Sequence, residues 1–306
     1  MLKFFKNLNL GKKIAGGFAI LIIIAVFMAY MGYSGLNTID TRVEIANKAS
    51  SLVGSVQEIR HETKQYMLTE DEEYIKNINN ITEEIYTQID RTKAKMTVEE
   101  DKKETEKLRT IAKEYNEAFN TYANTLKEQN NLREEFNSNE AQLKETIISL
   151  IDSQKEEYNS AVNRLDNTQD EPSNETINET MSSIEQKLNT RRLARNLLNN
   201  INSIGIQERS YVINLADNEK EKQYAQQTLA AFSEAEKTTN KLINVLNGEK
   251  DINEAKNILA KLKNTKQHFK NIVDKENIKE KNKEIMTNKA DSFLSSSTVI
   301  FALVLS

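Results

Sequence analysis

The sequence predicts an all-α protein built from long helices that run up and down. The chain has 306 residues but only 8 glycines and 1 proline, and residues 55–171 contain neither. β-Sheets need frequent turns, which draw on both residue types, so sandwiches, barrels and βαβ folds are excluded. Between about residues 36 and 291 the apolar side chains recur three and four positions apart, which is the period of a helix with one buried stripe.

The chain begins with a basic tip followed by an apolar segment. Four lysines are the only charged side chains before Asp40, and residues 14–32 form a run of 19 residues without a charge. A helix of that length rises about 28 Å, enough to cross a membrane. The positive-inside rule places residues 1–13 in the cytoplasm, so we expect a transmembrane helix at 14–33. The alternative is a cleaved signal peptide, but its apolar region spans only about 7–15 residues.

Capping signals and the few helix breakers divide residues 36–291 into six predicted helices. The predicted ranges are 36–69, 72–96, 99–165, 175–214, 217–246 and 251–291. Sequences of the capping-box type begin at Thr69, Thr97 and Asp251, and Pro172 falls in the loop after the third helix. An even number of helices returns the chain to the membrane face from which it started.

The end of the chain is apolar again. Residues 292–306 contain a run that is too short to span a membrane, and we expect it to be the truncated start of a second transmembrane helix. The third predicted helix is about 100 Å long, twice the length of the first. Two four-helix bundles stacked end to end would cover it, whereas a kink at 137–139 would weaken this inference. A faint repeat, which places Tyr66 on Tyr211, supports two modules.

Basic residues on otherwise apolar helix seams are the candidate binding residues. Counting heptads from Leu36 and Met181 gives this set: Arg60, Arg191, Arg195 and Arg209. The planar guanidinium group suits bidentate capture of a carboxylate, so converging arginines predict a site for a small organic anion. Gly205 lacks a side chain close to Arg209, which predicts a small space there.

The alternative is that the seam drifts around the helix. A straight helix slips about 20° per heptad against a strict repeat, so Val56, Ile59 and Thr63 would form the core and Arg60 would face solvent. In that case the arginines pair with nearby glutamates.

Other functional classes find little support in the sequence. The chain has no cysteine, and its two histidines, His61 and His268, lack metal-site spacing, so we expect no metal site and no thiol chemistry. No phosphate-binding loop or catalytic nucleophile motif occurs, so we expect no cofactor and no enzymatic activity. The basic tip is followed by an acidic remainder of the chain, which argues against binding of nucleic acid.

The N-terminus resembles that of bacterial methyl-accepting chemotaxis proteins, through the segment from Asn9 to Phe18, the apolar helix and Gly35-Leu36. The segment from Lys64 to Tyr74 is similar to the helix-turn-helix tip of four-helix sensor domains, and a second such tip lies near Glu208 to Tyr211. Six helices with two tips resemble the helical bimodular sensor domain. The resemblance implies two stacked four-helix modules, a homodimer, and recognition of a small organic acid between helices. Arg60 and the three arginines of the fourth helix match the regions that contribute to binding in that family.

From this resemblance we expect a sensor domain outside the cell's inner or plasma membrane, periplasmic or extracellular, that signals to chemotaxis proteins through a cytoplasmic part downstream of residue 306. Three alternatives stay open. The same sensor could belong to a histidine kinase or a cyclase. The chain could be a membrane-anchored scaffold that binds no ligand. A polyamine sensor would place carboxylates, not arginines, in its pocket.

Overall fold

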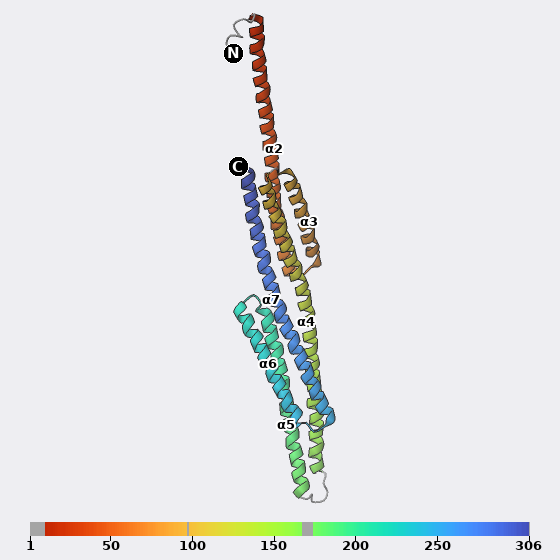
Figure 1. Ribbon diagram of the computed structural model, residues 1–306. Helices are drawn as coiled ribbons and strands as arrows, with labels where there is room; N and C mark the ends of the chain where they lie inside the picture. Colours follow the sequence, from red (N-terminus) through yellow and green to blue (C-terminus); the bar gives the residue numbers. More distant parts are fainter. Residues whose placement is uncertain (1–9, 97, 167–173, 306) are drawn as a thin grey trace. The chain divides into compact units, whose positions relative to one another are not determined.

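The computed structural model describes residues 10–96, 98–166 and 174–305, which are helical apart from short turns (Figure 1). The helices are α2 (Leu10–Thr69), α3 (Glu72–Lys95), α4 (Glu99–Asp166), α5 (Asn174–Ile213), α6 (Asn218–Val245) and α7 (Glu249–Leu305). No strand occurs in these ranges, so the predicted all-α class is confirmed.

The helix boundaries between residues 36 and 291 fall within two residues of the predicted ones, but the two outer helices are longer. α2 begins at Leu10 rather than near 36, and α7 continues to Leu305 rather than ending near 291. No proline interrupts either segment. A glycine inside a helix costs only about 1 kcal/mol, so Gly32 and Gly35 do not end α2. α4 is one unbroken helix through residues 137–139.

The N-cap of α3 lies two positions after the residue that we expected. The side chain of Asp71, not Thr69, accepts the hydrogen bond from the backbone of Glu73 and is the N-cap of α3. Thr69 is instead the last residue of α2. Glu70 between them has a φ of 58°, the left-handed conformation that glycine usually supplies at a helix end. Thr97, the start of another predicted capping box, lies outside the described residues.

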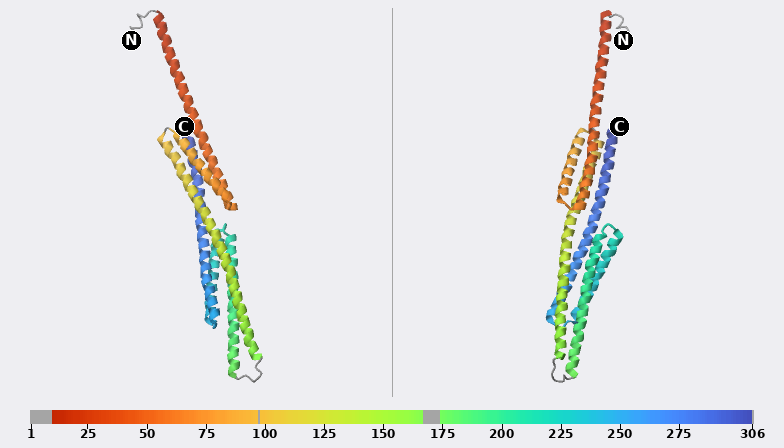
Figure 2. Two further views of the ribbon diagram at one scale, coloured as in Figure 1. Left: turned by 90° about the vertical axis from the view of Figure 1, so that its right-hand side faces the viewer. Right: turned by 180° about the vertical axis from the view of Figure 1, so that it is seen from behind.

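The chain divides into two compact units, which are described separately. Unit 1 comprises residues 1–122 and 281–306, and unit 2 comprises residues 123–280. In unit 1, α2 and α3 form a hairpin that is joined by the first part of α4 and the last part of α7 (Figure 2). Its core includes Leu52, Ile85, Leu108 and Phe119, all at most 1% exposed.

Unit 2 is built from the α5–α6 hairpin, the remainder of α4 and the first part of α7 (Figure 1). One aromatic ring from each helix meets at its centre. These rings are Phe136 of α4, Tyr211 of α5, Phe232 of α6 and Phe269 of α7, with centroids 5.5–6.4 Å apart in the pairs that touch. The division into two units agrees with the two predicted modules, whereas their end-to-end stacking stays a prediction.

Within the described part of the chain, no helix has an apolar stretch long enough to cross a membrane. The side chains of residues 14–18, 20 and 301–306, which belong to the two predicted membrane segments, lie outside the description.

Candidate ligand-binding site

The position of Arg60 depends on which face of α2 is buried. Val56, Ile59 and Thr63 are each 5% exposed, whereas Ile39 and Val43, which a heptad count from Leu36 places on the seam, are 59% and 50% exposed. The drift of a straight helix against a strict heptad therefore occurs, and Val56, Ile59 and Thr63 form the core as the alternative predicted. The partner of Arg60, however, is Asp291 and not a nearby glutamate. Arg60 stands at the edge of the buried face, with its side chain 44% exposed.

A cavity of about 170 Å³ opens beside Arg60 within unit 1. Three helices line it: Arg60, Thr63, Lys64 and Met67 come from α2, Tyr115 from α4, and Lys283, Met286, Thr287 and Ala290 from α7. Three of these side chains are basic and none is acidic. A cavity with this lining favours a small anion, because each positive charge lowers the energy of a negative ligand.

The guanidinium group of Arg60 is held by a single, exposed carboxylate. Its Nη1 donates to Oδ1 of Asp291 at 3.2 Å, and the Asp291 side chain is 62% exposed. Exposed ion pairs contribute only about 0.2–1 kcal/mol because water competes for both partners. A ligand carboxylate that offers two oxygens to the planar guanidinium can therefore replace this contact.

Two buried hydroxyl groups form the inner wall of the cavity. The oxygen atoms of Thr63 and Tyr115 lie 2.9 Å apart and share one hydrogen bond. Because each hydroxyl carries one hydrogen and the shared bond uses one, a second hydrogen is left to donate to a ligand. Burial raises the pKa of Tyr115 above its ordinary value, against the opposing effects of the Thr63 hydrogen bond and the Arg60 charge. Tyr115 therefore stays neutral at physiological pH.

The other three predicted binding arginines lie on α5, in unit 2, and they do not converge on one another. Arg195 and Arg209 are exposed. The guanidinium carbon of Arg191 lies 5.5 Å from the ring centroid of Tyr158, a cation–π contact. Arg191 and Arg209 are 18 residues apart, which is about 27 Å along a helix. A single small anion does not reach both.

The space predicted beside Gly205 is filled by a side chain from another helix. A Cβ atom at this position would meet Oε1 of Glu140 at 1.9 Å, so the carboxylate of α4 packs directly on the backbone of α5. Glu140 is 7% exposed and pairs with Lys144 at 2.8 Å, although Oε1 has no donor in hydrogen-bond geometry. The prediction of an empty space was wrong because it used one helix without its neighbour.

A buried polar cluster connects α4 and α7 in unit 2, and the sequence reasoning did not find it. The side-chain amide of Gln129 donates to the Ile272 carbonyl at 3.1 Å and to Glu276 at 2.8 Å. The Lys279 ammonium group donates to Gln129 and to Glu276, both at 2.9 Å. The three side chains are joined to one another by hydrogen bonds, so we interpret the cluster as a structural element that fixes how α4 and α7 align.

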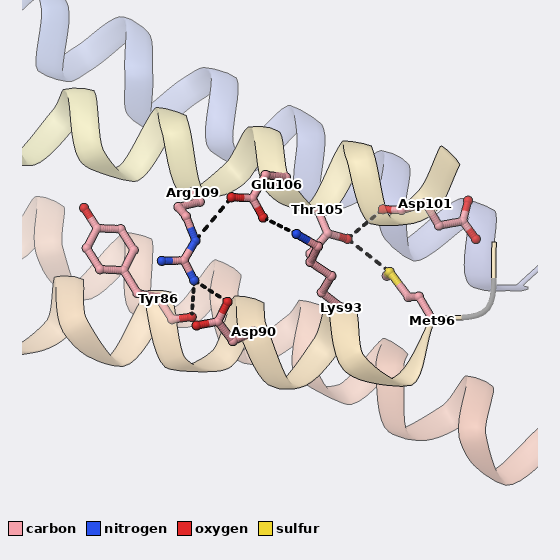
Figure 3. Close-up of polar contacts among 8 residues, drawn as sticks. All are labelled: Tyr86, Asp90, Lys93, Met96, Asp101, Thr105, Glu106 and Arg109. Carbon is pink, nitrogen blue, oxygen red and sulfur yellow. Dashed lines mark hydrogen bonds and ion pairs between the residues drawn. The ribbon is translucent and has the colours of Figure 1, made fainter. Parts of the chain in front are cut away.

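The α3–α4 hairpin of unit 1 is held by a second polar network (Figure 3). Arg109 donates to the Tyr86 carbonyl at 3.3 Å, pairs with Asp90 and Glu106, and stacks 5.2 Å from the centroid of the Tyr86 ring. Lys93 pairs with Glu106 at 2.7 Å. The hydrogen bond that Arg109 donates to the Asp90 carboxylate is the main cause that raises the pKa of Arg109. These groups satisfy one another, so the network serves the fold.

No group of three or more His, Asp or Glu side chains in the described ranges is arranged to hold a metal ion. His61 is exposed, and Nδ1 of His268 lies 3.5 Å from Glu135.

Comparisons with known proteins add one likeness in fold. No family model matches the chain, and no curated protein matches it. Among solved structures, it is similar to a chain in the crystal structure of the TorS sensor domain–TorT complex in the presence of TMAO, with a TM-score of 0.59 and 12% identity. The match covers 87% of this chain and 98% of that one. The likeness shows that the two chains share an all-α fold.

Most of the cavity lining escaped the sequence reasoning. Arg60 was singled out because it is basic and adjoins an apolar seam. Tyr115 has the helical spacing of a core residue, and Lys283 is one of many exposed lysines, so neither carries a local signal. Only the packing of α4 and α7 against α2 brings them to Arg60.

Proposed function

We propose that this chain is the sensor region of a transmembrane chemoreceptor and that it recognises a small organic anion in the unit 1 cavity. The observation that carries the proposal is the cavity itself, where Arg60, Lys64 and Lys283 surround the hydroxyl groups of Thr63 and Tyr115. Its volume of about 170 Å³ suits a ligand with a handful of heavy atoms. The likeness in fold to a sensor domain supports the same class of protein.

The membrane anchor of this proposal is the first part of α2. Apolar side chains from Leu21 to Tyr33 are 48–74% exposed, which is costly in water and natural in lipid. Residues 14–33 would form the first membrane helix and residues 292–306 the start of the second. The sensor region would then lie on the outer side of the inner or plasma membrane, periplasmic or extracellular.

Signalling would use the helix that connects the cavity to the second membrane segment. Met286, Thr287 and Ala290 of α7 line the cavity, and the same helix continues to Leu305. A ligand shifts a conformational equilibrium only as far as it binds one packing of the helices better than the other. Anion binding at Arg60 would favour one position of α7 relative to α2 within a homodimer. The signal would be passed to the chemotaxis proteins. The alternative is a histidine kinase or a cyclase, and the sequence downstream of residue 306 would distinguish the two.

Binding measurements on a matched pair of variants test the site. We expect calorimetry on the full chain in detergent micelles to detect one or more acids in a panel of small mono- and dicarboxylates. Arg60→Gln should lower the affinity about 10- to 100-fold, because hydrogen bonds between charged groups are worth about 1.5–3 kcal/mol.

Arg195→Gln is the control, since this residue is an exposed arginine of unit 2. Its affinity should equal that of the unaltered chain. An equal loss of affinity in both variants, or a loss of affinity in Arg195→Gln alone, would contradict a binding site in unit 1. Absence of binding across the panel would favour the ligand-free scaffold.

A further inference from the structure

A second, smaller cavity adjoins the polar one and has the opposite character. It has a volume of about 20 Å³ and lies in unit 1 along the same three helices, with one further residue from α3. Apolar side chains line it: Val56, Ile59, Ile85, Ile111, Ala112 and Phe293. Lys289 also contributes, but its ammonium group is paired with Glu114, so its hydrocarbon stem is what faces the space. We call this space the apolar annex.

The annex and the polar cavity share two wall residues, Tyr115 and Ala290. The hydroxyl of Tyr115 bonds to Thr63, which lines the polar cavity. On α2, Ile59 of the annex lies four residues before Thr63, a rise of about 6 Å along the helix. The annex is therefore about one helical turn from the polar cavity.

We infer that the annex receives the hydrocarbon end of the ligand whose carboxylate binds at Arg60, so that the preferred ligand is a short-chain monocarboxylate without an ammonium group. This inference rests on the proposed function and narrows its ligand class. A cavity of about 20 Å³ holds little more than one small sphere, which matches a terminal methyl or ethyl group.

Chemical selection by the two spaces follows from their linings. A dicarboxylate long enough to reach the annex would bury its second charge among apolar side chains, which is expensive without a partner. An α-amino acid would bring its ammonium group close to Arg60, Lys64 and Lys283, and like charges repel. A monocarboxylate of three or four carbons is long enough to span one helical turn. It has neither a second carboxylate to bury nor an ammonium group to be repelled.

A homologous series of acids tests the inference on the full chain in detergent micelles. Calorimetric affinity should rise about two- to fourfold for each methylene from acetate through propionate to butyrate, as expected for burial of a CH₂ group. The rise should stop at longer acids, which exceed the annex. Succinate and 2-aminobutyrate should each bind at least about tenfold more weakly than butyrate, which matches the cost of an uncompensated charge.

Two variants of the annex give the matched comparison. Ala112→Leu fills the annex. The affinity for butyrate should therefore fall to that for acetate, while the affinity for acetate should stay unchanged. Ile111→Ala enlarges it and should shift the preference to a longer acid, which keeps the test valid if the first variant folds poorly. Ala118→Leu is the control, because Ala118 is buried on the same helix and lines neither cavity.

The outcomes separate this inference from the proposed function. If acetate and butyrate bind with equal affinity and Arg60→Gln weakens the binding of both, the proposed role of the annex is wrong but the anion site at Arg60 is supported. Preferred binding of succinate or of 2-aminobutyrate would lead to the same conclusion. If Arg60→Gln leaves the affinity for the acids unchanged, or if no acid binds, both the role of the annex and the proposed anion site are wrong.

Discussion

Arg60 already has a carboxylate partner, which the proposed ligand would have to replace. Its present partner, Asp291, is exposed and lies on α7, the helix that also lines the cavity. In the proposed function, a ligand carboxylate would compete with Asp291 for the same guanidinium group. The ion pair would then lower the apparent affinity for any anion.

Asp291→Asn removes this competitor while it keeps the size of the side chain. We expect the affinity for the bound acid to rise about two- to fivefold, since exposed ion pairs are worth about 0.2–1 kcal/mol. Calorimetry on the full chain measures the change, with Asp274→Asn of unit 2 as the control. A lower affinity in Asp291→Asn would mean that Asp291 positions Arg60 instead of competing for it.

Glu70 offers a separate test of backbone strain at a single residue. Its φ of 58° places a residue with a Cβ in the left-handed region, which costs about 1–2 kcal/mol relative to glycine. Replacing Glu70 with glycine would relieve this strain. Part of the resulting gain in stability is offset because glycine makes the unfolded chain more flexible. Glu70→Gly should therefore raise the unfolding free energy by about 0.5–1 kcal/mol, measured by urea denaturation. Glu72→Gly, inside the first turn of α3, should lower it, and stabilisation by both changes would contradict the strain argument.

At the scale of helices, unit 2 buries carboxylates from each of its four helices. Glu140 of α4, Glu208 of α5, Glu221 of α6 and Glu276 of α7 are all at most 8% exposed. Burial raises the pKa of Glu208, which the charge of Glu140 raises further and the charges of Arg133 and Arg209 oppose. Burial and the charge of Glu276 raise the pKa of Glu221, which accepts a hydrogen bond from Tyr211.

These raised pKa values make the stability of unit 2 depend on pH. A carboxyl group whose pKa is raised on folding binds more protons in the folded state than in the unfolded state. Its stabilising contribution is complete below the unfolded pKa of about 4.5 and is lost as the pH rises through the folded value. We expect the thermal midpoint to rise as the pH falls from 7.5 towards 4.5. Asp217 acts in the opposite sense because its pKa is lowered, but that loss begins only nearer pH 4.

Glu208→Gln isolates this effect because the amide keeps the shape and removes the titration. The variant should be more stable than the unaltered chain at pH 7.5, and its thermal midpoint should change less between pH 7.5 and 4.5. Differential scanning calorimetry measures both. Glu234→Gln, an exposed change on α6, should leave the slope as it is. An unchanged slope in Glu208→Gln would show that this carboxyl does not titrate in that window.

At the scale of the whole chain, the helices could be predicted and their mutual contacts could not. Helix ends are local events, so the capping sequences, Pro172 and the near absence of glycine were enough to place those between residues 36 and 291 to within two residues. Which face of α2 is buried depends on small rotations that accumulate along a long helix, and a strict heptad count therefore misplaced Ile39 and Val43. Glu140 on Gly205, and Tyr115 beside Arg60, are contacts between helices far apart in sequence, and no single helix records them.

The absence of cysteine from the chain permits a clean test of its orientation in the membrane, because each introduced cysteine is the only thiol. If residues 14–33 span the membrane with the lysine-rich tip inside, Asp40→Cys should react with a membrane-impermeant maleimide on intact cells, after removal of the outer membrane where one exists. Lys6→Cys should react only after the cells are opened. Equal labelling of the two positions in intact cells would contradict a spanning helix, and labelling of Lys6→Cys alone would reverse the orientation. With α2 inserted in this way, the cavity at Arg60 would face the outside, as the proposed recognition of an external anion requires.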